Sequence, residues 1–277
     1  MSTRIKVSGP TGSIVAALIA SVLFMMGAGG QKTPLKPEDV VEQAIYAYGG
    51  RPAIYGIQRN GVIKSNLKLT TPDGVREGVA TNKFIRKPKL TEDLLVLTLE
   101  FGRSRFVIGF DGKKGWTQDN GEIQDPPPAE TIAAFRNAHA HSYETLLRYK
   151  ENEAKIEYAG NRSFGPNNEL DLIDLTLPDG TKTRYEVSRK FRRIIYLEYE
   201  DQPAAPEAKP VKYRLYFKDF RAIQNTLVPY DVQVFRDGVL SEERKLVEVA
   251  YNVQLEESAF KPENANKATE TNKPANP

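Results

Sequence analysis

Residues 101–116, FGRSRFVIGFDGKKGW, give the clearest prediction of architecture in this chain, because an apolar run meets an Asp-Gly pair and then returns toward the only tryptophan. An Asp-Gly pair between two strand-like runs is a strong signal for a tight β-hairpin, since both central residues of a type I′ turn need positive φ. Phe106, Ile108 and Phe110 alternate with their neighbours, so they share one face of the first strand. We therefore predict a hairpin that turns at residues 111–112 and presents an apolar face to the rest of the fold.

The same pattern of alternating runs and glycine-containing turns recurs along most of the chain. Further turns are expected at Asp73-Gly74, Asn120-Gly121, Asp179-Gly180 and Asp237-Gly238. About 10 or 11 strands joined in this way predict a meandering antiparallel sheet, and a sheet of that size tends to curl. The predicted fold is α+β and mainly β. It is a strongly curved antiparallel sheet, an unclosed half-barrel, with a small helical lid over its concave apolar face.

The helical pattern is confined to two places. Pro37 and the acidic residues after it begin a helix with apolar residues at helical spacing, and Gly49-Gly50 ends it. A proline-rich stretch then leads into two short helices at about residues 129–149, which we interpret as an insertion laid over the sheet. A single domain is expected over residues 34–262, followed by a polar tail at 263–277 that we expect to be disordered.

The first 30 residues have the pattern of a secretory signal peptide. Arg4 and Lys6 precede an apolar run at residues 14–26, and small residues lead up to a cleavage site near Gly30. The apolar run is shorter than the roughly 20 residues that a membrane span needs. We expect export out of the cytoplasm, and the alternative is an uncleaved N-terminal membrane anchor.

Composition narrows the classes of function. The 39 Lys and Arg residues against 36 Asp and Glu give a net charge of +3, which is too balanced and too dispersed to indicate nucleic-acid binding. The chain has no cysteine, so disulfides, thiol nucleophiles and cysteine-ligated zinc are excluded. No nucleophile elbow, metalloprotease motif or phosphate-binding loop occurs. We expect no enzymatic activity and no cofactor.

The order of these motifs resembles the LolA/LolB-like superfamily of periplasmic lipoprotein carriers, as a divergent member. The resemblance covers most of residues 38–262. It rests on the order of signal peptide, helix ending in Gly-Gly, strand meander, DGKKGW at 111–116, helical insertion, second meander, and the closing stretch NVQLEESAFKP at 252–262. The long loop at 201–210 and the extended tail depart from the family pattern. The lid-locking arginine of the family is not carried over to any position in this chain.

The resemblance implies a half-barrel whose lid covers acyl chains of a lipid or lipoprotein in transit to the outer membrane. Expected partners are those acyl chains and a membrane-associated donor or acceptor protein, and the chain is expected to be a monomer. The alternative from another class is an envelope sensor or scaffold domain of the same fold that binds a protein partner.

The candidate ligand-binding residues are apolar or aromatic side chains on the predicted sheet face and lid. Each of them could equally fill a solid core, because periodicity identifies a face and not whether that face is hollow. Trp116 could line the mouth of the cavity or pack at the end of a strand. The candidate cavity residues are Leu95, Leu97, Phe106, Ile108, Trp116, Ile132, Phe135, Tyr213, Leu215, Phe217, Tyr230 and Val232.

Two other clusters stand out. His139 and His141 are the only histidines, and two positions apart on a helix they point in different directions, so no metal site is predicted. The run RKFRR at 189–193 is the one local basic cluster. It could meet an anionic membrane surface or a partner, or it could be a solvated turn.

Overall fold

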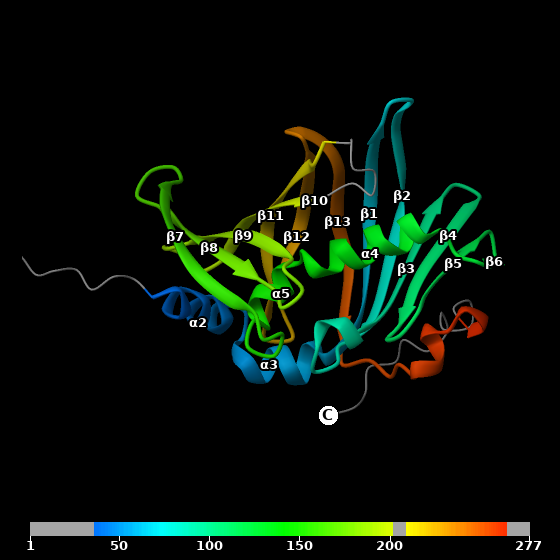
Figure 1. Cartoon of the computed structure of the whole chain (residues 1–277), viewed down its shortest axis with the longest axis horizontal. Helices are drawn as coiled ribbons and strands as arrows, with labels where there is room; N and C mark the ends of the chain where they lie inside the picture. Colours follow the sequence, from blue (N-terminus) through cyan, green and yellow to red (C-terminus); the bar gives the residue numbers. More distant parts are fainter. Residues whose placement is uncertain (1–35, 202–208, 265–277) are drawn as a thin grey trace, which may run out of the picture. The chain divides into compact units, whose positions relative to one another are not determined.

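A large antiparallel sheet forms the protein in this computed structural model, which describes residues 36–201 and 209–264 (Figure 1). In the described residues the sheet has 13 strands in the order β6-β5-β4-β3-β2-β1-β13-β12-β11-β10-β9-β8-β7, and it stays open because β6 and β7 are both edges. The strands are β1 (Asn60–Thr71), β2 (Gly74–Ile85), β3 (Leu94–Phe101), β4 (Ser104–Asp111), β5 (Gly115–Asp119), β6 (Glu122–Gln124), β7 (Lys155–Ser163), β8 (Glu169–Thr176), β9 (Lys182–Ser188), β10 (Ile194–Asp201), β11 (Val211–Ile223), β12 (Thr226–Arg236) and β13 (Val239–Tyr251).

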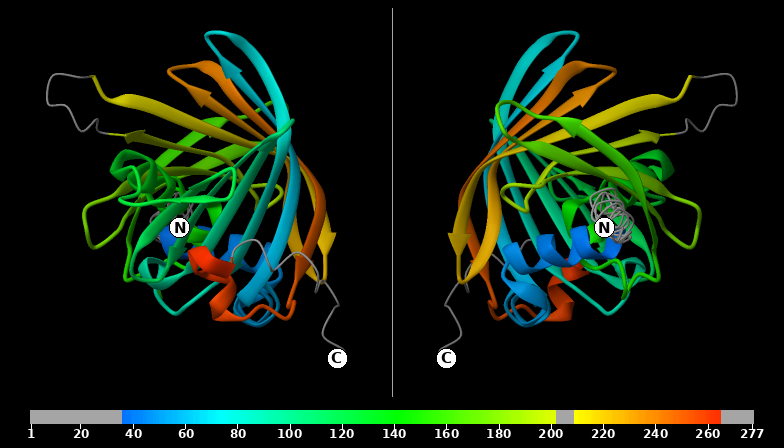
Figure 2. Two further views of the ribbon diagram at one scale, coloured as in Figure 1. Left: turned by 90° about the vertical axis from the view of Figure 1, so that its right-hand side faces the viewer. Right: turned by 90° about the vertical axis from the view of Figure 1, so that its left-hand side faces the viewer.

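The predicted unclosed, mainly β fold with a few helices is confirmed. Two meanders, β1 to β6 and β7 to β13, are joined where β1 pairs with β13, and Figure 2 shows how strongly the combined sheet curves. The strand count exceeds the prediction of 10 or 11. The short strands β5 and β6, of five and three residues, account for the difference, because so few residues give no readable alternation.

The hairpin predicted from residues 101–116 is present as the β4–β5 pair, but its turn is not type I′. Gly112 has a φ of +88°, whereas Asp111 does not have a positive φ. The Asp111 carboxylate instead accepts hydrogen bonds from the backbone N–H groups of Lys113 and Lys114, at 2.9 and 2.7 Å. The aspartate therefore builds a longer turn with its side chain, and a true pair of positive φ values occurs at Asp237-Gly238.

Four α-helices and four short 3₁₀ helices accompany the sheet in the described residues. The α-helices are α2 (Pro37–Ala47), α3 (Gly50–Gly56), α4 (Ala129–Ala140) and α5 (Tyr143–Leu147), and the 3₁₀ helices are η1 (Ile57–Arg59), η2 (Leu90–Glu92), η3 (Glu257–Phe260) and η4 (Pro262–Asn264). No described helix is long and apolar enough to cross a membrane. The predicted signal peptide, most of the 201–210 loop and most of the tail lie outside the described residues.

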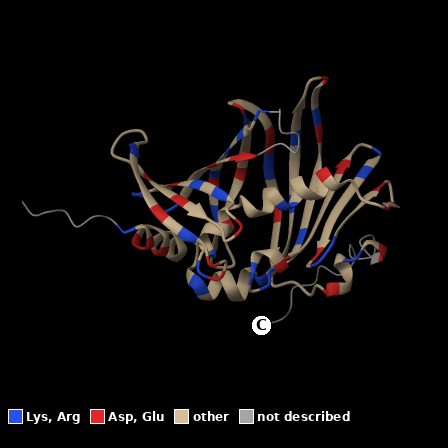
Figure 3. Ribbon diagram, in the orientation of Figure 1, with Lys and Arg blue, Asp and Glu red and all other residues tan. Residues whose placement is uncertain are grey.

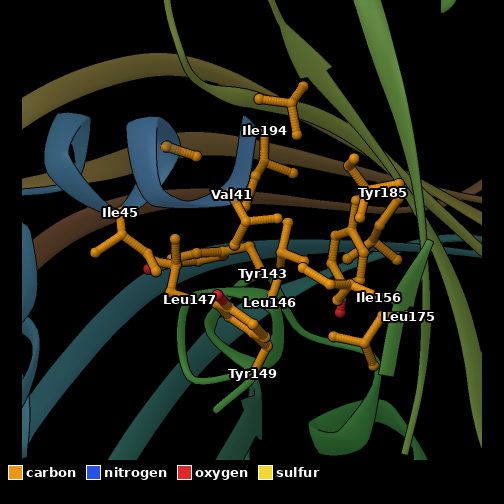
Figure 4. Close-up of a cluster of buried hydrophobic side chains, with 14 of the residues drawn as sticks. Val41, Ile45, Tyr143, Leu146, Leu147, Tyr149, Ile156, Leu175, Tyr185 and Ile194 are labelled. Carbon is orange, nitrogen blue, oxygen red and sulfur yellow. The ribbon is translucent and has the colours of Figure 1, made fainter. Parts of the chain in front are cut away.

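One half of the concave face is a filled core. Helices α2 and α5 pack their apolar side chains against the inner faces of β7 to β11, and Figure 4 shows this cluster. Many of its members are essentially inaccessible to solvent. They include Val41, Ile45, Leu146, Leu147, Ile173, Leu175, Tyr185, Ile194 and Leu197.

A separate apolar cluster covers the outer face of the sheet. The chain after β13 returns across β3 to β5, and Phe260 of η3 packs there with Val96 and Val107. The Trp116 indole N–H donates to the Phe260 carbonyl oxygen at 2.8 Å, and the Gln118 amide donates to the Pro262 carbonyl oxygen at 2.6 Å. The C-terminal segment is thus fastened to the convex side and leaves the concave side to the helices.

Candidate functional site

The other half of the concave face contains a pocket of about 250 Å³ between the strands and helix α4. Its floor comes from β1 to β3 and β11 to β13, and its roof comes from α4 and the segment that leads into α5. The larger apolar side chains of the wall include Ile63, Phe84, Leu95, Leu97, Phe135, Leu215, Phe217, Val228, Val232 and Leu246.

The pocket wall differs from the filled core in how completely its side chains are buried. Side chains from both meanders and from the lid are only half-buried, although they lie on the inner face of the sheet. Protein interiors are normally packed to the density of organic crystals, so such side chains border unfilled space. The half-buried apolar residues of the wall are Ile63, Leu97, Phe135, Leu215, Val232 and Leu246.

The charged groups at one end of the pocket neutralise each other. Arg86, at the end of β2, forms an ion pair with Glu144 of α5 at 3.1 Å, and both side chains are largely buried. Arg86 also donates to the Gln58 backbone carbonyl at 2.8 Å, which fixes the guanidinium in place. This arrangement holds α5 against the sheet and offers no uncompensated charge to a ligand.

His141 is a further polar group of the wall, and it is neutral at physiological pH. Its ring stacks on Tyr199 with centroids 3.7 Å apart, and its Nδ1 lies 2.7 Å from the Thr183 hydroxyl. Burial lowers the pKa of His141 to about 4, which outweighs the opposite effect of Asp179. The wall near this residue is therefore suited to an uncharged ligand.

Helix α4 covers the pocket without being buried itself, since none of its residues is fully buried. Ile132 rests on Gly115 of β5, where a Cβ atom would come within 2.3 Å of the isoleucine side chain. The Arg136 guanidinium lies 4.8 Å from the centroid of the Phe110 ring. One end of α4 is thus held by a few contacts, including the contact of Ile132 with Gly115. This is what we expect of a helix that covers the pocket and is not part of the core.

The other end of α4 is tied to a buried ion pair. His139 Nε2 lies 3.0 Å from Asp93 Oδ2, and the same carboxylate accepts two hydrogen bonds from Arg148 at 2.6 and 3.1 Å. Asp93 also accepts the Lys87 backbone N–H at 2.7 Å. Burial opposes ionisation of Asp93, but the hydrogen bonds from His139 and Arg148 lower its pKa overall.

The structure brings together half of the predicted cavity residues. These are Leu95, Leu97, Phe135, Leu215, Phe217 and Val232, which all contribute to the pocket wall.

Four further predicted residues lie elsewhere on the concave side and do not line the pocket. Ile108 is buried opposite Leu97 on β4, and Phe106 lies further along the same face. Tyr213 stacks on Tyr199 with centroids 5.0 Å apart, and Ile132 packs on β5. These side chains extend the apolar face beyond the hollow, which periodicity could not distinguish from the hollow itself.

Tyr230 and Trp116 also lie outside the pocket. Tyr230 is buried in a cluster next to the pocket, with the Arg221 guanidinium 4.3 Å from its ring centroid. Of the two positions considered for Trp116, the structure has the packed one and not the cavity mouth, because its ring lies on the opposite face of the sheet. Gly109 on β4 faces it, and a Cβ at that glycine would come within 2.2 Å of the indole.

Several pocket residues were not predicted. Ile63 was visible in the alternation of the first strand, but the small and polar positions Ser65, Ala80 and Asn82 carry no apolar signal. The histidine pair also contributes to the wall, as does the Arg86–Glu144 pair. No group of three or more potential ligands that could hold a metal ion occurs within the described ranges.

By sequence, no family model and no curated protein matches this chain. By structure, it is similar to a DUF1329 family protein from Desulfovibrio piger, with a TM-score of 0.56 and 11% identity over 82% of this chain and 98% of that one. It is also similar to a putative outer membrane lipoprotein-sorting protein domain from Vibrio parahaemolyticus, with a TM-score of 0.54 and 12% identity over 84% and 99% of the two chains. A LolA superfamily protein from Nitrosomonas europaea gives a TM-score of 0.48 and 11% identity over 82% and 98%.

The fold assignment rests on the first two of these structures, each of which is covered almost completely. The open 13-stranded sheet and its few helices correspond to the architecture predicted from the order of motifs. The chain therefore has the fold of the DUF1329 family protein from Desulfovibrio piger and of the putative outer membrane lipoprotein-sorting protein domain from Vibrio parahaemolyticus.

Proposed function

We propose that this protein is a non-enzymatic carrier that binds acyl chains of a lipid or lipoprotein in the pocket beneath α4. The observation that supports the proposal is the unfilled apolar wall, where side chains such as Leu97, Leu215 and Leu246 are half-buried on the inner face of the sheet. Exposing apolar side chains in a concave site without a ligand is unfavourable, and an acyl chain would cover them.

The pocket volume sets how much of a ligand it accepts with α4 in place. A water molecule takes up about 30 Å³, and a methylene group is of similar size. A volume of about 250 Å³ therefore accommodates roughly eight methylene groups. At about 0.8 kcal/mol for each methylene group, their transfer from water contributes on the order of 6 kcal/mol before the costs of binding. A longer chain, or several chains, requires α4 to move outward.

The charges of the pocket wall support binding of an uncharged part of a ligand. Arg86 is paired with Glu144, Arg244 is paired with Glu242, and His141 is uncharged at physiological pH. A charged headgroup would lose its hydration in such a site without gaining a free counter-charge. We therefore propose that the acyl tail enters the pocket and that the headgroup stays at its mouth.

The cellular setting of the proposal is the periplasm. It is supported by the signal-peptide pattern at residues 1–30 and by the structural similarity to the putative outer membrane lipoprotein-sorting protein domain from Vibrio parahaemolyticus. The carrier would act as a monomer. It would receive its cargo from a membrane-associated donor and pass it to an acceptor on the way to the outer membrane.

Two measurements test the proposal. Lipids extracted from protein purified from its native envelope are identified by mass spectrometry, and uptake of a fluorescent fatty acyl probe is titrated. Leu215→Trp fills the pocket and should reduce uptake at least tenfold, whereas Tyr216→Trp, on the opposite face of the same strand, should leave it unchanged. Circular dichroism verifies that both variants are folded.

The carrier proposal fails if no lipid co-purifies and no probe binds. It also fails if both tryptophan variants take up the probe as the wild type does. A protein that takes up no probe but co-purifies with a protein partner would instead support the sensor or scaffold function.

A further inference from the structure

The turn between β9 and β10, residues 189–193 (RKFRR), has a basic and aromatic tip for which acyl binding in the pocket provides no role. Phe191 is 50% exposed, which makes it one of the most exposed large apolar side chains of the described residues. Lys190 lies beside its ring, with the ammonium 5.2 Å from the ring centroid, and the Arg193 guanidinium is 5.7 Å from it. The Arg193 guanidinium also lies 5.2 Å from the centroid of the Phe220 ring. The turn thus presents an exposed phenyl ring flanked by cations.

The positive charge of this tip is not neutralised by neighbouring acids. Arg189 forms ion pairs with Glu169 and Asp171 and is therefore compensated. By contrast, over residues 36–201 and 209–264 no acidic side chain forms an ion pair with the other three cations of the turn, Lys190, Arg192 and Arg193. Elsewhere on the sheet, basic and acidic residues are interspersed (Figure 3).

The turn is held in one conformation by hydrogen bonds. The Ser188 backbone N–H donates to the Arg193 carbonyl oxygen at 2.8 Å, and the Arg192 N–H donates to the Ser188 carbonyl oxygen at 2.7 Å. The Ser188 hydroxyl also accepts the Phe191 backbone N–H at 3.1 Å and donates to the Asn168 side chain at 3.1 Å. Arg192 adopts a φ of +57°, a conformation that most residues avoid. The fold therefore fixes Phe191 in an exposed position instead of letting it turn inward.

We propose that this tip docks the protein onto the surface of a bilayer that contains anionic phospholipids. Lys190 and Arg192 match the negative surface, and an aromatic ring at the apex is suited to the boundary between headgroups and acyl chains. A polar hollow of about 440 Å³ lies next to the tip and leaves room for a phospholipid headgroup. Its wall contains Asn167, Lys190 and the Arg189–Glu169 ion pair, so the Glu169 carboxylate there is compensated. A docking site for an acidic protein would not need the exposed phenyl ring at the centre of the charge.

Sedimentation with vesicles measures the proposed docking. The full chain is mixed with vesicles of neutral lipid alone, and separately with vesicles that contain roughly 30 to 40 mol% phosphatidylglycerol and therefore have a strongly negative surface. Each cation near such a surface strengthens binding about fivefold, so the double variant Lys190→Gln/Arg192→Gln should bind the anionic vesicles about 30-fold more weakly. Raising the salt concentration should reduce the difference between the wild type and this variant.

The matched control removes two exposed lysines from another turn. Lys113→Gln/Lys114→Gln in the β4–β5 turn changes the net charge by the same amount and should lower binding less than twofold. All variants keep the apolar run at residues 14–26, so any membrane binding by that segment is common to them. Equal loss in the two double variants would overturn the proposal, since it would show an effect of net charge and not of the tip.

A fluorescence measurement tests the apex directly. The only native tryptophan, Trp116, is buried, so Phe191→Trp adds the one exposed indole. Its emission should shift to the blue with anionic vesicles and stay unchanged with neutral ones. An unchanged emission with anionic vesicles, or a shift produced by soluble polyglutamate alone, would contradict membrane docking and assign the tip to an acidic protein.

Discussion

Removing the Asp93 carboxylate should cost this protein far more stability than removing an equivalent carboxylate at the surface. Asp93 and Arg148 form a bidentate ion pair in which the two side chains are 0% and 2% exposed. Arg184 and Asp174 form the same bidentate contact, at 2.7 and 2.8 Å, with side chains 47% and 37% exposed. The two pairs share their chemistry and differ in burial, so they form a matched comparison.

The expected magnitudes follow from what each variant leaves behind. Asp93→Ala leaves a buried guanidinium without its counter-ion and a backbone N–H of Lys87 without its acceptor, which should cost about 3 to 5 kcal/mol. Asp174→Ala leaves an exposed arginine that water solvates, and it should cost about 0 to 1 kcal/mol. A domain of this size is stable by roughly 5 to 15 kcal/mol, so the first loss is a substantial part of the total.

Urea unfolding followed by the fluorescence of Trp116 provides the assay, because this sole indole is buried. Asp93→Asn keeps the shape of the side chain and should lose less than Asp93→Ala, which gives a folded variant if the alanine variant does not fold. The reasoning is refuted if Asp93→Ala and Asp174→Ala destabilise the protein equally.

The pH dependence offers an independent check on the same carboxylate. Because the pKa of Asp93 is lowered in the folded state, its contribution is complete above the unfolded value of about 4 and is lost as the pH falls below it. The difference in unfolding free energy between the wild type and Asp93→Asn should therefore shrink below pH 4. A difference that stays constant to pH 2.5 would contradict this assignment.

Three further predictions concern the lid, the wall and the buried histidine. Gly115→Ala should push Ile132 off β5, which should increase the rate of acyl-probe uptake and lower the unfolding free energy by about 1 to 3 kcal/mol. An unchanged rate would show that this end of α4 does not limit uptake. Leu246→Asp should abolish probe uptake, whereas Val247→Asp, whose native side chain is 52% exposed, should not, and equal effects in a titration would argue against the pocket. As the pH is lowered from 6.5 to 4, the unfolding free energy should fall by up to about 1.4 kcal/mol per pH unit, because His141 binds a proton in the unfolded state but not in the folded state. His141→Phe should remove this pH dependence in urea titrations.

Strand alternation and turn chemistry were enough to predict the type of fold. Both are local properties: a strand with one covered face alternates with a period of two, and a turn needs residues that tolerate its backbone angles. The β4–β5 hairpin illustrates the limit of this reasoning. The sequence of residues 101–116 predicted the hairpin but not its turn type. The Asp111 carboxylate accepts hydrogen bonds from the next backbone N–H groups, and this stabilises a turn other than type I′.

The face that Trp116 occupies could not be predicted, because it depends on a partner 144 residues away. The indole packs toward Phe260, and the space for it exists only because residue 109 is a glycine. The Asp93–Arg148 pair has the same origin, since 55 residues separate its members and each resembles an ordinary polar loop or helix position. Long-range contacts of this kind leave no periodic trace in a single sequence.

The contrast between the filled and the hollow half of the concave face shows why strand alternation alone could not locate the pocket. Leu197 and Leu215 are directly paired on neighbouring strands, so they share a face, yet the first is inaccessible and the second borders empty space. The difference comes from the cover and not from the strands. Helices α2 and α5 fill the space above β7 to β10 with large side chains, whereas α4 lies over the pocket on half-buried residues and on Gly115. Whether an apolar face becomes core or cavity is therefore set by the volume of the element opposite it, which is the property that the proposed tryptophan and alanine variants alter.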